Sequence, residues 1–392
     1  MSETPTVAEQ ASPPPNPGAP TPDDKRSDSA PLAFLLTHQS GVVIVVALLI
    51  ALTVGAVLIR LQGVAPLYAY ETIVREALLV DGGLTRTLQK TAPLVLTGLA
   101  VVLPLRVGLF NIGGQGQLIF GAMFGAYIAY AFGGLGILGA VLGMVAGIAA
   151  GALIGFVAGV LKATRGVHEV ITTIMLNYIA AGVTWWLVTG PMQAESSKTS
   201  GIPQTELIPP SAQVGAIGGI PVGFLIAIVL AGLCWWMLSR TTLGFRFNTV
   251  GANKHAAGYA GIKISRIVTL SMVFGGGLAG LAGALEAQGT LHRFEPAIGG
   301  TLGFDGITIA LLARGNPLAT IPAALLVGIL RTGAPGLQFA TQTATLPGGI
   351  KPEVVDLLLA IILLMVSIPV LGKWIFRSRA DKVSAASTSW GN

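Results

Sequence analysis

Charged residues are scarce in this chain of 392 residues. Asp, Glu, Lys and Arg make up 10% of the sequence, against about 25% in ordinary soluble domains. Hydrophobic residues, by contrast, make up 53%. A soluble fold needs more polar surface than this composition supplies. The sequence therefore predicts an all-α polytopic membrane protein, in which long apolar helices cross the bilayer.

Cysteine and clustered histidine are also missing. The single cysteine, Cys234, excludes an internal disulfide and a cysteine metal cluster. The four histidines are scattered without ligand spacing, so we expect no metal site. The basic residues form no dense patch, so no nucleic-acid partner is expected. No GxxxxGK(S/T) phosphate loop is present. We therefore expect no catalytic residue, no cofactor in this chain and no enzymatic activity of its own.

The charge-free runs predict how the chain is organised. Residues 1–39 are rich in Pro, Ser, Thr and Asp and predict a disordered cytoplasmic tail. Residues 40–375 predict the transmembrane domain, and 376–392 a cytoplasmic C-terminal tail. Val107–Leu161 lacks any charge and is long enough for two crossings joined near 133–136. We expect about ten crossings, near 41–59, 86–105, 114–132, 135–161, 170–189, 221–239, 267–288, 303–314, 316–333 and 354–374. The second and eighth have the weakest patterns, and the eighth is short enough for a half-helix.

The basic residues predict the orientation in the membrane. Basic loops stay in the cytoplasm, and a topology with both termini inside assigns 15 of the 23 Lys and Arg residues to the inner side. The loop Arg240–Arg266 contributes five basic residues and no acid. We therefore expect a multi-pass protein of the plasma or inner membrane, in contact with lipid, with both termini in the cytoplasm.

Glycine is abundant and, in one predicted helix, periodic. It recurs every fourth residue, which aligns the glycines on one helix face. Without side chains there, a neighbouring helix can approach closely. This stripe indicates either tight packing inside one subunit or a subunit interface that slides. The residues assigned to helix packing are Gly143, Gly147, Gly151 and Gly155.

Polar residues within the apolar domain form a second set of candidates. The segment Arg106–Gln117, RVGLFNIGGQGQ, places amides among glycines that can break a helix. It is either a capped turn or a gate near the cytoplasmic mouth. Asp305 either caps the short helix that follows or contacts substrate; Glu286 and Asn177 are similar cases. The residues assigned to a pathway or gate are Asn111, Gln115, Gln117, Asn177 and Asp305.

The cytoplasmic loop contains a segment that suits a partner protein. Asn253 can cap a short helix, and Gly258 or Gly261 can end it. Small residues give this helix a face that fits a protein groove better than a lipid surface, although an ordinary basic loop is the alternative. The residues assigned to partner coupling are Gly251, Asn253, Ala256, Ala257, Tyr259 and Gly261.

Four segments in order along the chain resemble one family. FNIGGQGQ is similar to the FNIG-x-EGQ segment of ABC-importer permeases that serve nucleosides and simple sugars. HEVITTIMLNYIA, GANKHAAGYAGIKISR and GFDGITIALLARGNPLATIPAALLVGILRTGA resemble three further segments of these permeases. The resemblance covers residues 106–334. Two positions depart from the family pattern: Gln115 replaces a Glu, and His168 replaces an Asn.

The resemblance implies a fold and a set of partners. The fold would be the ten-helix permease fold of the vitamin B12/ribose importer type. The partners would be an ABC ATP-binding subunit that holds the ATP, a second permease subunit and an extracytoplasmic substrate-binding lipoprotein. The function would be to form the translocation pathway of an importer, with nucleosides as the expected cargo. Ribose or another simple sugar is the alternative cargo, and an ion-coupled secondary transporter is the alternative class.

Charged residues predicted near the outer side suggest where a binding protein would dock. Arg75, Arg86 and Lys90 could attract acidic residues on such a protein, mainly by speeding encounter in a salt-sensitive manner. The sequence leaves open whether two permease subunits would be identical.

Overall fold

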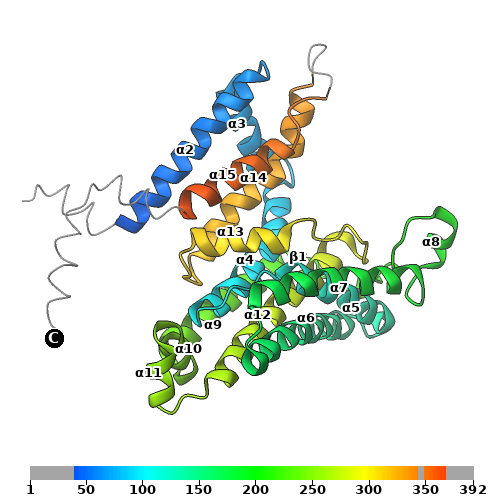
Figure 1. Cartoon of the computed structure of the whole chain (residues 1–392). Coiled ribbons are helices and arrows are strands. Elements are labelled where there is room, and N and C mark those ends of the chain that lie inside the picture. The colour runs from blue at the N-terminus through cyan, green and yellow to red at the C-terminus, as the bar shows by residue number, and fades with distance from the viewer. Residues whose placement is uncertain (1–38, 343–347, 368–392) are drawn as a thin grey trace, which may run out of the picture.

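The computed structural model describes residues 39–342 and 348–367, and almost every element in them is a helix (Figure 1). Apolar segments form helices here because lipid offers no hydrogen-bond partner to exposed backbone groups. The predicted all-α class is thus confirmed. The expected tails lie outside the described residues, except that Gln39 begins the first described helix.

Most of the long helices lie within or close to the predicted segments. The α-helices are, in order, α2 (Gln39–Leu61), α3 (Pro66–Val74), α4 (Gly83–Arg106), α5 (Gly114–Ala131), α6 (Ile137–Arg165), α7 (Glu169–Thr189), α8 (Glu195–Ser200), α9 (Val222–Arg240), α10 (Thr242–Ala252), α11 (Lys254–Tyr259), α12 (Ile264–Glu286), α13 (Leu302–Leu312), α14 (Thr320–Ala340) and α15 (Glu353–Ser367). The short 3₁₀- and π-helical turns are η2 (Arg75–Leu79), η3 (Gly133–Leu135), η4 (Pro210–Ala212) and η5 (Ala287–Leu291), and β1 (Ala216–Ile217) pairs antiparallel with β2 (Ile220–Pro221).

Only some of the helices are long and apolar enough to cross a membrane. Among the described residues, six helices are long and apolar enough to cross a membrane, namely α4, α6, α7, α9, α12 and α14. The bent pair of α2 and α3 with η2 raises the number to seven if it forms one span. α13 is short, as the eighth predicted segment suggested. α15 covers the start of the tenth predicted segment, and the remainder lies outside the described residues. About ten crossings therefore stays a prediction.

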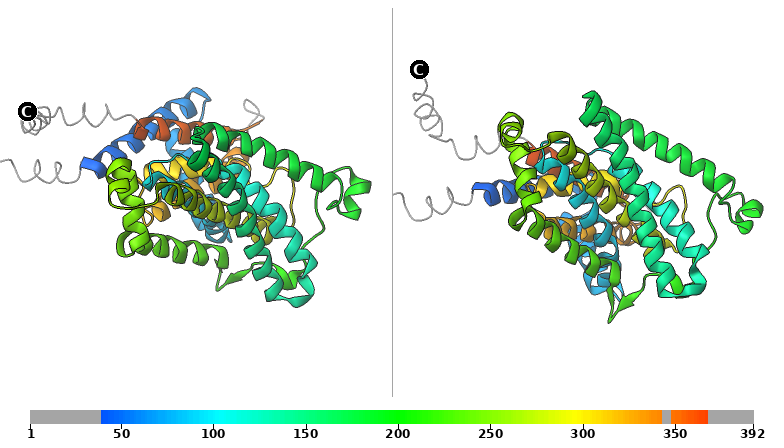
Figure 2. Two further views of the ribbon diagram at one scale, coloured as in Figure 1. Left: turned by 60° about the horizontal axis from the view of Figure 1, so that its bottom comes forward. Right: turned by 90° about the horizontal axis from the view of Figure 1, so that it is seen from below.

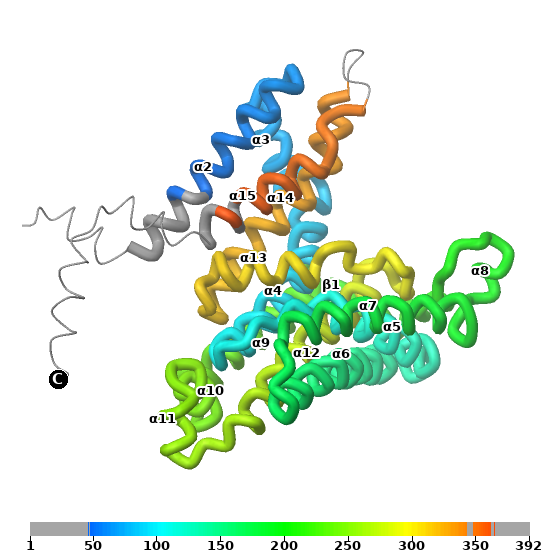
Figure 3. The backbone as a smooth tube through the Cα atoms, viewed as in Figure 1, coloured from blue at the N-terminus to red at the C-terminus, as the bar shows by residue number. Residues whose placement is uncertain are grey.

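The sequence reading missed α3 and placed its residues in an outer loop. The chain bends by 114° between α2 and α3, and α3 runs back beside α2 (Figures 1 and 3). Gly63 has φ +84, and Pro66 begins α3, where proline is well tolerated. The Tyr70 hydroxyl then donates to the Leu52 carbonyl oxygen at 2.6 Å. Glu71 interrupts the apolar run within α3, so hydropathy along the sequence does not indicate this helix.

α5, α6 and α12 pack together through glycine. A Cβ on Gly151 would collide with the carbonyl oxygen of Gly276, and one on Gly155 with that of Met272. Gly147 likewise lies against Ala284 of α12, and Gly143 against Gln288 of η5. The structure thus directs the stripe of α6 toward helices of the same chain, which allows backbones to touch where side chains would separate them.

α4 is the most buried of the candidate spans, although its sequence pattern is weak. It contacts α12, α13, α14 and α9. Polar Thr87 and Thr91 fit inside because their hydroxyls donate to the carbonyl oxygens of Ala77 and Thr87, each at 2.7 Å. A polar side chain whose hydrogen bond is made within the protein can be buried at little cost.

Different short helices lie at the two ends of the helical region. α10 and α11 lie at one end, and α8 lies at the opposite end of α7 (Figures 1 and 2). α12 begins next to α11 in the chain and finishes at Glu286. The basic loop and the end of α12 are therefore separated by the length of a membrane-spanning helix.

Candidate functional site

A cavity of about 340 Å³ opens among α4, α12, α14, α15 and the segment 297–302. Four charged side chains line it, namely Lys90, Glu286, Arg331 and Asp356, and the other lining residues are mostly Gly, Ala, Pro, Val and Leu. We call it the charged cavity. Because Glu286 ends α12, this cavity lies toward the end of the molecule opposite α10 and α11. Its volume is within the range of about 300–1,000 Å³ typical of small-molecule sites.

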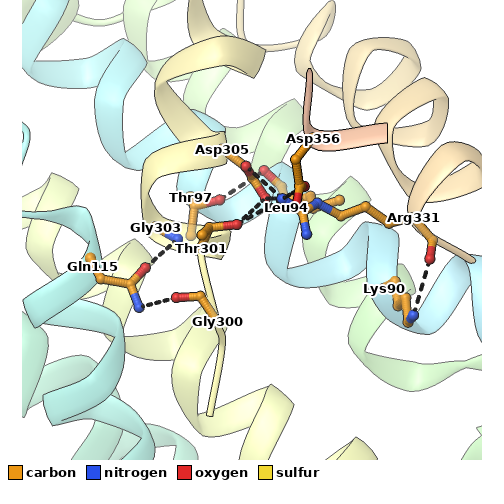
Figure 4. Close-up of polar contacts among 10 residues, drawn as sticks. All are labelled: Lys90, Leu94, Thr97, Gln115, Gly300, Thr301, Gly303, Asp305, Arg331 and Asp356. Carbon is orange, nitrogen blue, oxygen red and sulfur yellow. Dashed lines mark hydrogen bonds and ion pairs between the residues drawn. The ribbon is translucent and has the colours of Figure 1, made fainter. Parts of the chain in front are cut away.

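Arg331 joins three helices beside this cavity (Figure 4). One guanidinium nitrogen, Nη2, lies 2.8 Å from Oδ2 and 3.0 Å from Oδ1 of Asp305, at the start of α13. The same nitrogen lies 3.2 Å from Asp356 Oδ1 on α15 and donates to Thr301 Oγ1 at 2.7 Å. Asp305 and Arg331 are only 12% and 22% exposed, so each needs its partner to offset desolvation.

Lys90 and Glu286 face the same cavity without pairing. No ion pair within 4.0 Å joins their charged atoms. The Lys90 ammonium donates to the Arg331 carbonyl oxygen at 3.4 Å, which is a long hydrogen bond. Glu286 Oε2 accepts from Thr290 Oγ1 at 3.3 Å. Both groups therefore keep hydrogen-bonding capacity directed at the cavity.

The position of Lys90 corrects one sequence expectation. Lys90 was expected among outer docking points, but it is half-buried in the wall of the cavity because α4 packs against both α12 and α14. Arg75 and Arg86, the other two proposed points, are exposed.

One wall of the cavity is bare backbone that Gln115 holds in place. Gly299 and Gly300 line the cavity with φ +75 and +44, which glycine adopts without strain. The Gln115 amide donates to the Gly300 carbonyl oxygen at 2.8 Å, and its Oε1 accepts from the Gly303 amide at 2.9 Å (Figure 4). A Cβ on Gly303 would collide with the Gln115 backbone. The predicted pathway residue Gln115 thus supports the cavity wall and does not line the cavity.

The other predicted amides, Asn111, Gln117 and Asn177, form hydrogen bonds with backbone groups or with one another. Asn111 donates to the Ala100 carbonyl oxygen at 3.2 Å and to Gln117 Oε1 at 3.0 Å. Asn177 of α7 accepts from the Gly116 amide at 2.8 Å and donates to the Ile112 carbonyl oxygen at 3.0 Å. The three side chains fix the break between α4 and α5 and tie it to α7. None of them lines the charged cavity.

At the opposite end, α10 and α11 form a compact hook. Asn253 caps α11 because its Oδ1 accepts from the backbone amides of His255 and Ala256, at 2.9 and 3.1 Å. Ala257 is fully buried against the protein itself and presents no surface to a partner, contrary to the expectation from its place in the small-residue face. Tyr259, by contrast, is 95% exposed.

The hook is in direct contact with the end of α4. A Cβ on Gly251 would collide with the Arg106 carbonyl oxygen, and the Arg106 side chain donates from Nε to the Gly315 carbonyl oxygen at 2.9 Å. Beside α10 and the start of α12, a groove of about 430 Å³ carries three basic side chains, Arg246, Lys263 and Arg266. Among the described residues, no three His, Cys, Asp or Glu side chains gather as metal ligands.

Comparison with known proteins identifies the family of this chain. Residues 83–367 match the branched-chain amino acid transport system permease component family. The chain belongs to this permease family. It is 34% identical to the guanosine ABC transporter permease protein NupP of Bacillus subtilis (strain 168), over 82% of this chain and 91% of that protein.

Two further relatives extend the comparison. The chain is 32% identical to the nucleoside ABC transporter permease protein NupB of Lactococcus lactis subsp. cremoris (strain MG1363), over 88% of this chain and 96% of that protein. It is 31% identical to the glucose ABC transporter permease protein TsgB13 of Haloferax volcanii, over 82% of this chain and 85% of that protein. This permease is therefore a transport component, in agreement with the resemblance found in its motifs.

The sequence singles out Asp305 and Gln115, but it does not single out Arg331. Asp305 and Gln115 stand inside motifs or glycine-rich breaks, where a polar residue is conspicuous. Arg331 was assigned to an outer loop because it ends a charge-free run. Its distance from Asp305, 26 residues along the chain, gives no local signal of pairing.

Proposed function

We propose that this permease is one of two permease subunits of an ATP-driven importer and that its cargo is a nucleoside. The identity to permeases named for guanosine and for nucleosides carries this proposal. The charged cavity supports it, because donors and acceptors surrounded by apolar wall suit a neutral solute with a polar edge and a flat apolar face.

The proposed assembly has four kinds of component. An extracytoplasmic lipoprotein delivers the cargo, a second permease completes the pathway, and an ATP-binding subunit supplies the energy. The proposed permease has ten helices in the fold of the vitamin B12/ribose importer type, with both termini in the cytoplasm. This orientation places the charged cavity on the outer side, where cargo enters, and places the hook inside.

The exposed part of the hook is the proposed contact with the ATP-binding subunit. Exposed Tyr259 projects from it, and aromatic side chains often dominate protein interfaces. The nearby basic groove would attract acidic residues. Because Gly251 touches the end of α4, movement of the hook passes directly to α4, which also carries Lys90. Shifting a two-state pathway from 1:99 to 99:1 requires about 5.5 kcal/mol of differential affinity.

Exposed Arg75 and Arg86 remain the proposed contacts for the binding protein. Charge reversal at these two positions should slow capture at low ionic strength and have little effect at high salt. Capture by the binding protein that is equally fast after reversal at low salt would remove them from this role.

Uptake of labelled nucleoside tests the function. A strain that lacks its own nucleoside transporters should accumulate guanosine when this permease is expressed with its binding protein, second permease and ATP-binding subunit. The matched control carries a Walker-motif variant of the ATP-binding subunit, which should abolish uptake. Failure to accumulate any nucleoside, with all four components present in the membrane fraction, would overturn the proposal.

A sugar is the second candidate cargo, favoured by the identity to a glucose permease. Unlabelled glucose and ribose in excess should leave nucleoside uptake unchanged if nucleosides are the cargo. An ion-coupled mechanism makes a separate prediction, because uptake would then persist when ATP is depleted and the ion gradient is kept.

A further inference from the structure

Lys90 and Glu286 are two charged residues of the cavity wall that form no ion pair with each other. Lys90 comes from α4 and Glu286 from α12, two helices that pack together, and both line the charged cavity. Of the cavity's other charged groups, Arg331 pairs with Asp356 and also with Asp305. Lys90 and Glu286 therefore supply the polar groups that a solute can use without breaking an existing ion pair.

Lys90 and Glu286 each keep hydrogen-bonding positions that no group of the described protein uses. A lysine ammonium has three N–H donors, and in this structure Lys90 directs one of them to the Arg331 carbonyl oxygen. A carboxylate has about four acceptor positions, and Glu286 uses one for Thr290. A solute that satisfies both groups must present acceptors on one part of its edge and at least one N–H or O–H donor on the next.

We propose that this pair selects 6-oxopurine nucleosides, such as guanosine and inosine, over adenosine. The inference rests on the proposed nucleoside function. Guanine offers O6 and N7 as adjacent acceptors, which lysine can donate to. Its N1–H and N2–H₂ groups lie next along the same edge and would donate together to the two oxygens of Glu286.

Adenine reverses this pattern at the decisive positions. It places the N6–H₂ donor where guanine has O6, so a donor would face the Lys90 ammonium. Its unprotonated N1 would face the Glu286 carboxylate, acceptor against acceptor. A site that must leave its own buried polar groups unpaired rejects a substrate strongly. Inosine keeps O6, N7 and N1–H but lacks N2–H₂, so it should rank between guanosine and adenosine.

The test compares the ratio of guanosine to adenosine kcat/KM for uptake in the complete transporter. Glu286→Gln and Lys90→Met are each measured with the same binding protein, so that its own preference cancels from the comparison with the unaltered permease. Each variant should lower the ratio about ten- to a hundredfold, as expected for loss of one base-reading contact. Lys351→Met and Glu353→Gln remove the same charges from exposed positions outside the cavity lining and should leave the ratio unchanged.

If a variant transports too slowly to measure, the ratio of guanosine to adenosine affinity is measured by direct binding of the labelled nucleosides to the purified complex. If this ratio stays within twofold of that of the unaltered permease in both cavity variants, the assignment of Lys90 and Glu286 is overturned. The proposed nucleoside function would still stand in that case, provided that the transporter takes up nucleoside. Absence of any nucleoside uptake by the unaltered transporter would overturn both.

Discussion

The layer formed by α5, α6 and α12 and the group formed by α4, α13, α14 and α15 achieve burial by different means. In the first, glycine lets backbones touch, and the packed faces carry little besides small residues. In the second, Arg331 bridges two carboxylates, and threonines bond to nearby carbonyl oxygens. Close backbone packing has one good arrangement, because displacing one helix separates many atoms at once. An ion pair can exchange partners as helices move.

This difference suggests a division of labour within the permease. The glycine-packed layer is suited to act as the rigid frame. The group with ion pairs borders the charged cavity and is suited to change between outward-open and inward-open arrangements, by rocking of packed helices. Four variants test this contrast through the free energy of unfolding, and their expected losses range from about 3 kcal/mol to about 0.5 kcal/mol.

Gly151→Leu should cause the largest loss, about 3 kcal/mol or more, because the added side chain meets backbone of α12 that cannot rotate away. The permease should fail to accumulate in membranes, and any purified protein should melt at a lower temperature. Gly182→Leu is the matched control, since a Cβ at that glycine of α7 meets nothing within 4 Å. Equal accumulation of the two variants would show that α6 and α12 are not packed through this stripe.

Arg331→Met should cost about 2–3 kcal/mol. Removing Arg331 leaves Asp305 with little solvent and no cation, and the loss falls below the 3–5 kcal/mol of fully buried pairs because water reaches part of the network. Adding Asp305→Asn should recover part of the loss, which a double-mutant cycle by thermal melting would measure. If the two substitutions destabilise additively, the ion pair does not hold α13 to α14.

Gln115→Ala should cost about 1 kcal/mol, through the two hydrogen bonds to Gly300 and Gly303. Because those bonds hold the wall of the charged cavity, the KM for uptake should rise together with the loss of stability. Gln62→Ala, at an exposed position on the turn after α2, provides the control. A normal KM in Gln115→Ala would mean that this wall does not shape the site.

The sequence predicts where the helices lie along the chain better than it predicts which helices pack against each other. Long charge-free runs located α6, α7 and α9, and the glycine turn at 133–136 was placed correctly. α3 is not predicted because Glu71 lies within it and Arg75 and Glu76 follow it, so the apolar run there is short. Apolar periodicity indicates that a helix face is buried. It does not indicate whether lipid or another helix covers that face.

The candidate site was predictable only in part. Asp305 and Gln115 lie in segments whose glycines and polar residues are unusual within a membrane domain, so the sequence singles them out. It also singles out Glu286, but not the residues that surround Glu286. The count of Lys and Arg residues on each side of the membrane places Arg331 and Lys90 on the outer surface. Such a count treats every cation near the end of a helix as exposed to solvent. Their convergence on one cavity depends on how α4, α12 and α14 pack, which lies beyond any local pattern.

Tyr259→Ala should have the smallest effect on stability, within about 0.5 kcal/mol, because the side chain is almost fully exposed and makes little contact within the chain. Its effect should appear in assembly: less ATP-binding subunit should copurify with the permease, and nucleoside uptake should fall in proportion. Tyr68→Ala, an exposed aromatic on α3, is the control and should leave copurification unchanged. A Tyr259→Ala permease that retains its ATP-binding subunit fully would show that Tyr259 is not part of the contact with that subunit.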